Sequence, residues 1–153
     1  MTLPAGTISM SQVATELGLN QNGLSLDHSW VRQLAGAGAS PATVSMSGLQ
    51  SQTAQPTWSG NPGSGPAMFI SMSVPFFRGT TSGVGTTSSP TQPVTLSFSA
   101  APNWNGNILI TNTSTNVSQL LNQQNSTTWT STGSPINLFR ANTTDNFKLS
   151  PSN

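Results

Sequence analysis

The chain has 153 residues, a formal net charge of +1 and 5% charged residues, whereas typical soluble domains contain about 25%. This length suits one ordinary domain with or without an appendage, so it excludes a large multidomain enzyme. The few Lys and Arg residues are dispersed along the chain, so we expect no surface that binds DNA or RNA.

The chain has enough large apolar side chains to build a core, because it contains 4 Trp and 6 Phe residues. Cysteine is absent, which leaves no disulfide frame, thiolate metal site or thiol nucleophile. We see neither a secretory leader nor an apolar run of about twenty residues, so no membrane span is expected. The expectation is synthesis in a cytoplasm followed by assembly into something larger.

A short phrase is repeated three times near the N-terminus, in residues 7–13, 24–31 and 43–49. Each copy places two apolar side chains on one face of a brief extended segment and ends at a residue suited to cap a helix. We therefore predict a short amphipathic helix after the first and second caps. The third copy predicts only a vestige, because Gly48 and a run of Ser and Gln weaken it.

The spacing of apolar residues supports both helices. In the first copy, Met10, Val13 and Leu17 share one face before Gly18, and glycine is a natural residue just past a helix end. In the second copy every fourth residue is apolar and Gly36 ends the helix; the residues are Leu26, Trp30 and Leu34.

These apolar faces are too small to form the core of an independent domain. They must be covered either by the rest of the same chain or by another copy or another protein. On the second interpretation, the predicted assembly interface consists of the apolar residues of the three phrases, namely Ile8, Met10, Val13, Leu17, Leu24, Leu26, Trp30, Val31, Leu34, Val44, Met46 and Leu49.

The sequence GTISMSQVATELG, followed by SLDHSWVRQLAG and then VSMSGL, resembles the N-terminal signature of small structural proteins encoded among the tail genes of tailed bacteriophages. The resemblance covers about the first third of the chain. Members more often have Asn-Asp where this chain has Asp27-His28, and Gly-Lys where it has Gln50-Ser51. The resemblance implies a virion protein, assembled in the bacterial cytoplasm, that contacts other tail or head–tail proteins and further copies of itself.

The composition changes after the third phrase. Residues 51–65 are rich in Ser, Gln, Gly and Pro, which is typical of a linker, and Trp58 stands alone there. We therefore divide the chain into an N-terminal helical and extended anchor over residues 1–50, a linker over 51–65 and a second domain over 66–153.

The second domain has the two-residue period of β-strands. Met68, Ile70, Met72 and Val74 alternate with other residues, and Phe76 and Phe77 continue this strand. Residues 80–93 contain Gly, Ser, Thr and Pro with few apolar residues, which predicts an exposed loop. The remaining predicted strands cover residues 94–99, 108–110, 117–121, 127–132, 136–139 and 147–149.

Residues 117–121 fit a strand or one helical turn, and we favour a strand. The count of about seven short strands at intervals of about ten residues is typical of an antiparallel sandwich. The absence of a strong helical pattern after residue 65 argues against a parallel α/β fold. The predicted fold class is therefore mainly β, an antiparallel β-sandwich preceded by a short helical N-terminal segment.

Little in the sequence indicates catalysis, because the chain has one His and three acidic residues. His28 lies beside Asp27, but neighbouring residues of a helix point to different sides, and Asp27 is better suited to cap the second helix. No cluster of acidic residues or His suggests a metal site. We expect no catalytic, cofactor-binding or metal-binding residue, no cofactor and no enzymatic activity.

The sequence leaves several functions open. The first is a virion structural protein of a tail, tail tip, baseplate or tail fibre that docks through its N-terminal segment and displays the sandwich. The second is a head decoration or head–tail adaptor protein. The third is a carbohydrate-binding or host-adhesion sandwich, in which Trp58, Trp104 and Trp129 form a stacking platform for a host-surface glycan. A core position is the alternative for these tryptophans.

Overall fold

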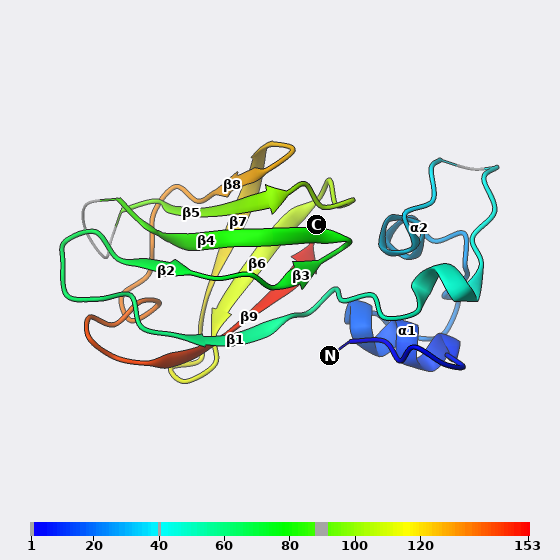
Figure 1. Cartoon of the computed structure of the whole chain (residues 1–153), viewed down its shortest axis with the longest axis horizontal. Coiled ribbons are helices and arrows are strands. Elements are labelled where there is room, and N and C mark those ends of the chain that lie inside the picture. The colour runs from blue at the N-terminus through cyan, green and yellow to red at the C-terminus, as the bar shows by residue number, and fades with distance from the viewer. Residues whose placement is uncertain (1, 40, 88–91) are drawn as a thin grey trace.

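The computed structural model describes residues 2–39, 41–87 and 92–153, and a small helical segment lies at one end of a β-sandwich (Figure 1). The helical elements are α1 (Met10–Leu17), α2 (Ser29–Ala35) and the 3-10 helix η1 (Met46–Leu49). The strands are β1 (Thr57–Gly60), β2 (Phe69–Ser71), β3 (Pro75–Phe76), β4 (Gly79–Thr86), β5 (Val94–Ala100), β6 (Asn107–Asn112), β7 (Val117–Asn125), β8 (Thr128–Thr130) and β9 (Asp145–Ser152). The predicted fold class is confirmed.

The strands follow the order β1-β9-β6-β7-β8-β5-β4-β2, with β3 also paired to β4, and every pairing is antiparallel. Strand β7 belongs to both layers of the sandwich. Its first half, residues 117–121, pairs with β6, and its second half pairs with β8. The favoured interpretation of residues 117–121 as a strand is therefore confirmed.

Alternation along the strands fills the space between the two layers. The inward side chains of β5 and β6 are fully or almost fully buried, as predicted; they are Val94, Leu96, Phe98, Ile108 and Ile110. On β9, Phe147 and Leu149 are likewise buried. Burying such side chains stabilises the fold by about 1.5–3 kcal/mol each.

Each of the three phrases begins a helical turn, as predicted. Ser9 and Gln12 form a reciprocal capping box at α1, and Gly18 ends the helix at φ 69°. The Ser45 side chain accepts a hydrogen bond from the Gly48 N–H at η1. These side chains satisfy backbone groups that a helix end leaves without partners.

The cap of α2 differs from the prediction. His28 is the N-cap, because its Nδ1 accepts a hydrogen bond from the Trp30 N–H at 3.3 Å. Asp27 instead accepts a hydrogen bond from Arg32 at 2.7 Å. The prediction that Asp27 caps the helix is therefore wrong, because a guanidinium within reach binds the carboxylate.

Strand β4 replaces the first half of the loop predicted over residues 80–93, of which residues 88–91 lie outside the described part. The strand is rich in glycine because its neighbour approaches very closely. A Cβ on Gly85 would lie 2.0 Å from the Met68 carbonyl oxygen, and one on Gly83 would lie 2.1 Å from the Phe69 ring. A sequence without alternating apolar residues thus forms a buried strand through close packing.

Two further expectations differ from the structure. Residues 57–60 of the predicted linker form β1, in which Trp58 stacks on Phe147 with ring centroids 5.5 Å apart. No strand forms over residues 136–139. There Leu138 and Phe139 are buried while Ile136 is 75% exposed, and the Leu138 carbonyl accepts a hydrogen bond from the Asn112 side chain instead of from a strand.

Candidate functional site

Half of the predicted interface residues are buried within their own chain. At most 8% of each of these side chains is exposed, and they share one continuous core with the sandwich; they are Ile8, Val13, Leu17, Val31, Leu34 and Leu49. For these six, the expectation of a face left uncovered by the chain is wrong. The sandwich to which the helical segment is joined supplies their apolar cover. The first interpretation, cover by the rest of the same chain, therefore applies to these six residues.

The other half remain partly accessible. Met10, Leu24, Leu26, Trp30, Val44 and Met46 are all half-buried. Five of these residues pack against the outside of the core, and Met10 does not. Among the apolar residues of the phrases, these six are therefore accessible to another protein and the buried six are not.

A two-residue turn between β3 and β4 holds the helical segment to the sandwich. Phe77 and Arg78 make this turn with φ 44° and 66°, the geometry of a type I′ hairpin that usually requires Gly or Asn. Phe77 is fully buried, and its N–H donates to the Thr53 carbonyl at 2.8 Å. Such backbone strain persists where surrounding contacts fix it.

The Arg78 side chain extends from this turn to two helical elements. Its Nε donates to the Leu34 carbonyl of α2 at 3.2 Å, and its Nη2 donates to the Gly48 carbonyl of η1 at 2.6 Å. Because the carbonyls at a helix end lack partners within the helix, one guanidinium satisfies two of them. We call these contacts the Arg78 clamp.

Aromatic rings fill the same junction. The centroid of the Trp104 ring lies 4.7 Å from that of the Phe77 ring and 5.0 Å from that of the Trp30 ring. The Trp104 indole N–H donates to the Asn107 carbonyl at 2.8 Å. On the other side of the segment, the Glu16 carboxylate accepts hydrogen bonds from the N–H groups of Ala54 and Gln55. The junction is thus fixed by apolar and polar contacts together.

A groove of about 430 Å³ lies on the surface of this junction. It is bounded by the end of α2, the loop after β5 and the end of β7, and we call it the junction groove. Its lining residues are Gln33, Gly36, Ala37, Gly38, Pro102, Asn103, Trp104, Asn105, Gln123 and Ser126. None of these lining residues carries a formal charge.

A second hollow of about 330 Å³ shares Gln33, Ala37, Gly38 and Asn105 with the junction groove and also touches Arg32. The Arg32 guanidinium donates to the carbonyls of Gly38 and Ala42 and to the Asp27 carboxylate. Four of its five N–H donors are used in this way. Its charge is therefore balanced before any ligand arrives.

The three tryptophans of the predicted platform do not share an exposed surface. Trp104 is 2% exposed and Trp129 is fully buried, and each indole N–H donates to a backbone carbonyl within the chain. Trp58 is half-buried against Phe147. The core alternative therefore describes Trp104 and Trp129, and only a margin of Trp104 reaches the junction groove.

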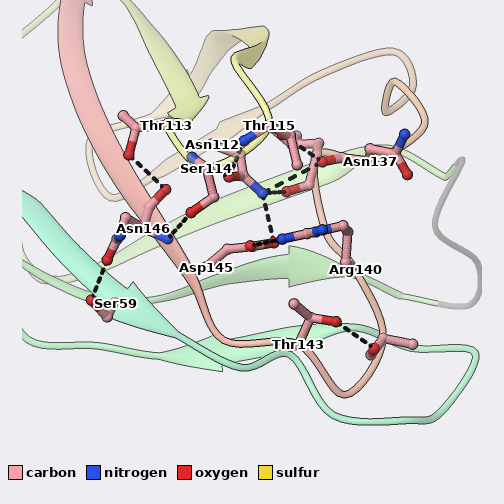
Figure 2. A network of polar contacts seen from close by, with 12 residues as sticks. Ser59, Asn112, Thr113, Ser114, Thr115, Asn137, Arg140, Thr143, Asp145 and Asn146 are labelled. Carbon is pink, nitrogen blue, oxygen red and sulfur yellow. Dashed lines mark hydrogen bonds and ion pairs between the residues drawn. The ribbon is translucent and has the colours of Figure 1, made fainter.

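A network of polar side chains surrounds Asp145, which is 1% exposed. Figure 2 shows Asn112 and Arg140 directed toward the Asp145 carboxylate, which accepts hydrogen bonds from Arg140 Nε at 3.0 Å and from Asn112 Nδ2 at 2.9 Å. The hydrogen bond from Arg140 lowers the pKa of this carboxyl below its ordinary value, more than burial raises it. Because Asn112 also donates to the Leu138 carbonyl, the network fixes the loop before β9.

The described residues bring few chemically reactive groups together. No three His, Asp or Glu side chains among them are grouped as metal ligands would be, and His28 serves as a helix cap. None of the helices in the described part of the chain is long and apolar enough to cross a membrane. The arrangement instead offers shape and neutral hydrogen-bonding groups at the junction groove.

Comparison with known protein families, with curated proteins and with solved structures finds no match for the chain. Apart from Trp104, the groove residues were not singled out from the sequence. Asn, Gln and Ser occur throughout this chain, so those that meet at the junction carry no distinguishing signal. Arg78 could have been noticed as one of only 4 Lys and Arg residues, beside an apolar pair at the end of a predicted strand.

Proposed function

We propose that this chain is a non-enzymatic structural protein of a tailed bacteriophage particle, located in the tail region. The observation that carries the proposal is that the three repeated phrases form one capped helical unit fixed to the sandwich. These are the same residues that resemble the N-terminal signature of phage tail structural proteins. Its partners in this role are other virion proteins and further copies of itself.

The scarcity of charge supports an assembly role. With 5% charged residues, most of the surface of this chain can be covered by another protein without removing ions from water. Burying an unpaired ion costs several kcal/mol, whereas burying a hydrogen-bonded neutral group costs far less. Interface cores in general are depleted of charged residues.

The helical unit docks through an accessible margin that consists of its half-buried apolar residues, Met10, Leu24, Leu26, Trp30, Val44 and Met46. Met10 is the residue best suited to test this. It is half-buried, and it occupies the first position of α1. An acidic side chain in the first turn of a helix is stabilising, because the helix N-terminus carries partial positive charge. A Met10→Asp substitution therefore places a charge at the proposed contact without weakening the helix.

The experiment introduces Met10→Asp into the phage genome and measures the amount of this protein in purified particles by quantitative mass spectrometry. We expect the wild-type protein to copurify with tails and the variant to be depleted at least about tenfold, which corresponds to about 1.4 kcal/mol. Ser11→Asp, at the neighbouring exposed position, is the matched control and should be incorporated normally.

Two results would overturn the proposal or its mechanism. If the wild-type chain is missing from purified particles, it is not a virion protein. If the wild-type chain is present and Met10→Asp is incorporated as well as Ser11→Asp, the virion role stands and docking through this margin is wrong.

A further inference from the structure

We infer that the junction groove binds a neutral oligosaccharide. This inference rests on the groove alone and does not depend on a role in a phage particle. It also differs from the platform of three tryptophans considered from the sequence, because its recognition groups are side chains of Asn, Gln and Ser.

The junction groove has the size of a small-ligand site. Its volume of about 430 Å³ lies within the range of about 300–1,000 Å³ found for ligand pockets. The adjoining hollow of about 330 Å³ shares four lining residues with it, so the two form one continuous depression. Their combined space is enough for a short chain of sugar rings.

The hydrogen-bonding groups of the groove match those of sugars. Asn103, Asn105, Gln123 and Ser126 are exposed, and their side chains make no hydrogen bond to other described residues. Amide and hydroxyl groups both donate and accept hydrogen bonds, as sugar hydroxyls do. Each of these side chains is therefore available to pair with a ligand without first breaking a contact within the protein.

Other classes of ligand fit the lining less well. An anion would find no free cation, because the groove lining is uncharged and Arg32 is already paired with Asp27 and two carbonyls. A peptide in extended form would need backbone partners. The N–H groups of Asn103 and Asn105 are already bonded to the Phe77 carbonyl and the Gln33 side chain.

The groove is also held in shape before any ligand binds. Its floor is the margin of Trp104, which is fixed by two neighbouring rings and by its hydrogen bond to Asn107. The Asn105 N–H donates to Gln33 Oε1 at 3.0 Å, which joins the two walls. A site that is already ordered loses less entropy on binding.

The test uses the full chain and saturation-transfer difference NMR with four neutral probes: maltotriose, cellotriose, tri-N-acetylchitotriose and a β-galactobiose. Trigalacturonate serves as an acidic comparison. We expect saturation transfer to at least one neutral probe and none to trigalacturonate. Gln123→Ala and Asn105→Ala should each weaken binding about fivefold to tenfold, as expected for the loss of one hydrogen bond.

The matched control is Gln124→Ala, which removes the neighbouring exposed glutamine that does not line the groove; its affinity should equal that of the wild type. A second variant, Gly38→Phe, adds a large ring at a residue that lines both hollows, and a Cβ there has no atom within 4 Å; it should abolish binding without unfolding the chain. Absence of binding to every neutral probe would overturn the inference. So would binding of trigalacturonate alone, or binding that Gly38→Phe leaves intact.

Discussion

At the scale of single residues, Asp145 is a buried carboxylate that accepts hydrogen bonds from both Arg140 and Asn112. Its side chain is fully buried, while that of its partner Arg140 is 40% exposed. The hydrogen bond from Arg140 lowers the pKa of the Asp145 carboxyl. The carboxylate therefore stabilises the folded state most at pH values where it is ionised in both the folded and the unfolded chain.

We predict that Asp145→Asn lowers the free energy of unfolding at neutral pH by about 1–3 kcal/mol, because it leaves buried donors without a good acceptor. The difference from the wild type should shrink as the pH falls below about 4, the ordinary pKa of Asp, and disappear below the lowered pKa of the folded state. Urea unfolding of both proteins across this pH range measures the effect.

The comparison residue is Asp27, whose side chain is 69% exposed in its pair with Arg32. Asp27→Asn should cost less than about 1 kcal/mol at neutral pH, because exposed ion pairs contribute little. Equal losses for Asp27→Asn and Asp145→Asn would show that burial does not determine the strength of these pairs.

At the scale of elements, β4 depends on glycine because its partner β2 lies so close. A Cβ at Gly85 would meet the Met68 carbonyl, which is backbone and cannot move alone. A Cβ at Gly83 would meet the far end of the Phe69 ring, which is 56% exposed and can turn into solvent. The two glycines of one strand therefore differ in how well they tolerate a side chain.

We predict that Gly85→Ala lowers the free energy of unfolding by about 1–3 kcal/mol, as overpacking usually does. Gly83→Ala should cost less than about 1 kcal/mol, because displacement of an exposed ring offsets part of the crowding. Thermal unfolding of the two variants separates these outcomes. Similar losses in both would mean that the Phe69 side chain is held as firmly as the backbone.

Several elements with a periodic pattern were predictable from the sequence, although the strand predicted from Met68 to Phe77 is divided into β2 and β3. Strand β4 was not predictable. The alternation of Val94, Leu96 and Phe98 marks β5, and the spacing around Gly18 marks the end of α1. In β4 the residues that pack are glycines, so the strand is determined by how closely β2 approaches. That distance belongs to the tertiary structure and leaves no alternating pattern along the chain.

The candidate site was less predictable for the same reason. Eleven of the twelve apolar residues of the phrases lie in the core or pack against it, but the sequence could not say which surface covers them. The answer depends on Trp104, which lies far along the chain and contacts Trp30 of α2 only after folding. The polar lining of the junction groove comes from three separate segments and has no local motif.

At the scale of the whole molecule, the Arg78 clamp couples the helical segment to the sandwich. We predict that Arg78→Asn speeds amide hydrogen exchange in α2 and η1 about tenfold or more, because two carbonyls lose a charged donor. Asparagine tolerates the φ of 66° found at this position, so the turn itself should remain. Hydrogen-exchange mass spectrometry of intact protein gives the measurement.

Exchange in β6 and β9 should stay unchanged in this variant, since neither strand touches the clamp. Lys148→Ala, which removes another of the few cations and lies in β9, serves as the control and should not speed exchange in α2 or η1. Faster exchange throughout the sandwich in Arg78→Asn would show that the helical segment and the sheets unfold as one unit.

The pairing of β1 with β9 affects how the protein bears mechanical force. Thr57 lies opposite Lys148 and Gly60 opposite Asp145, so the start of β1 and the end of β9 are at the same end of the sheet. Tension applied at these two points would peel the strands apart one hydrogen bond at a time, the direction in which antiparallel strands resist least. An assembly under load would therefore have to grip this protein across its faces rather than pull it by these strand ends.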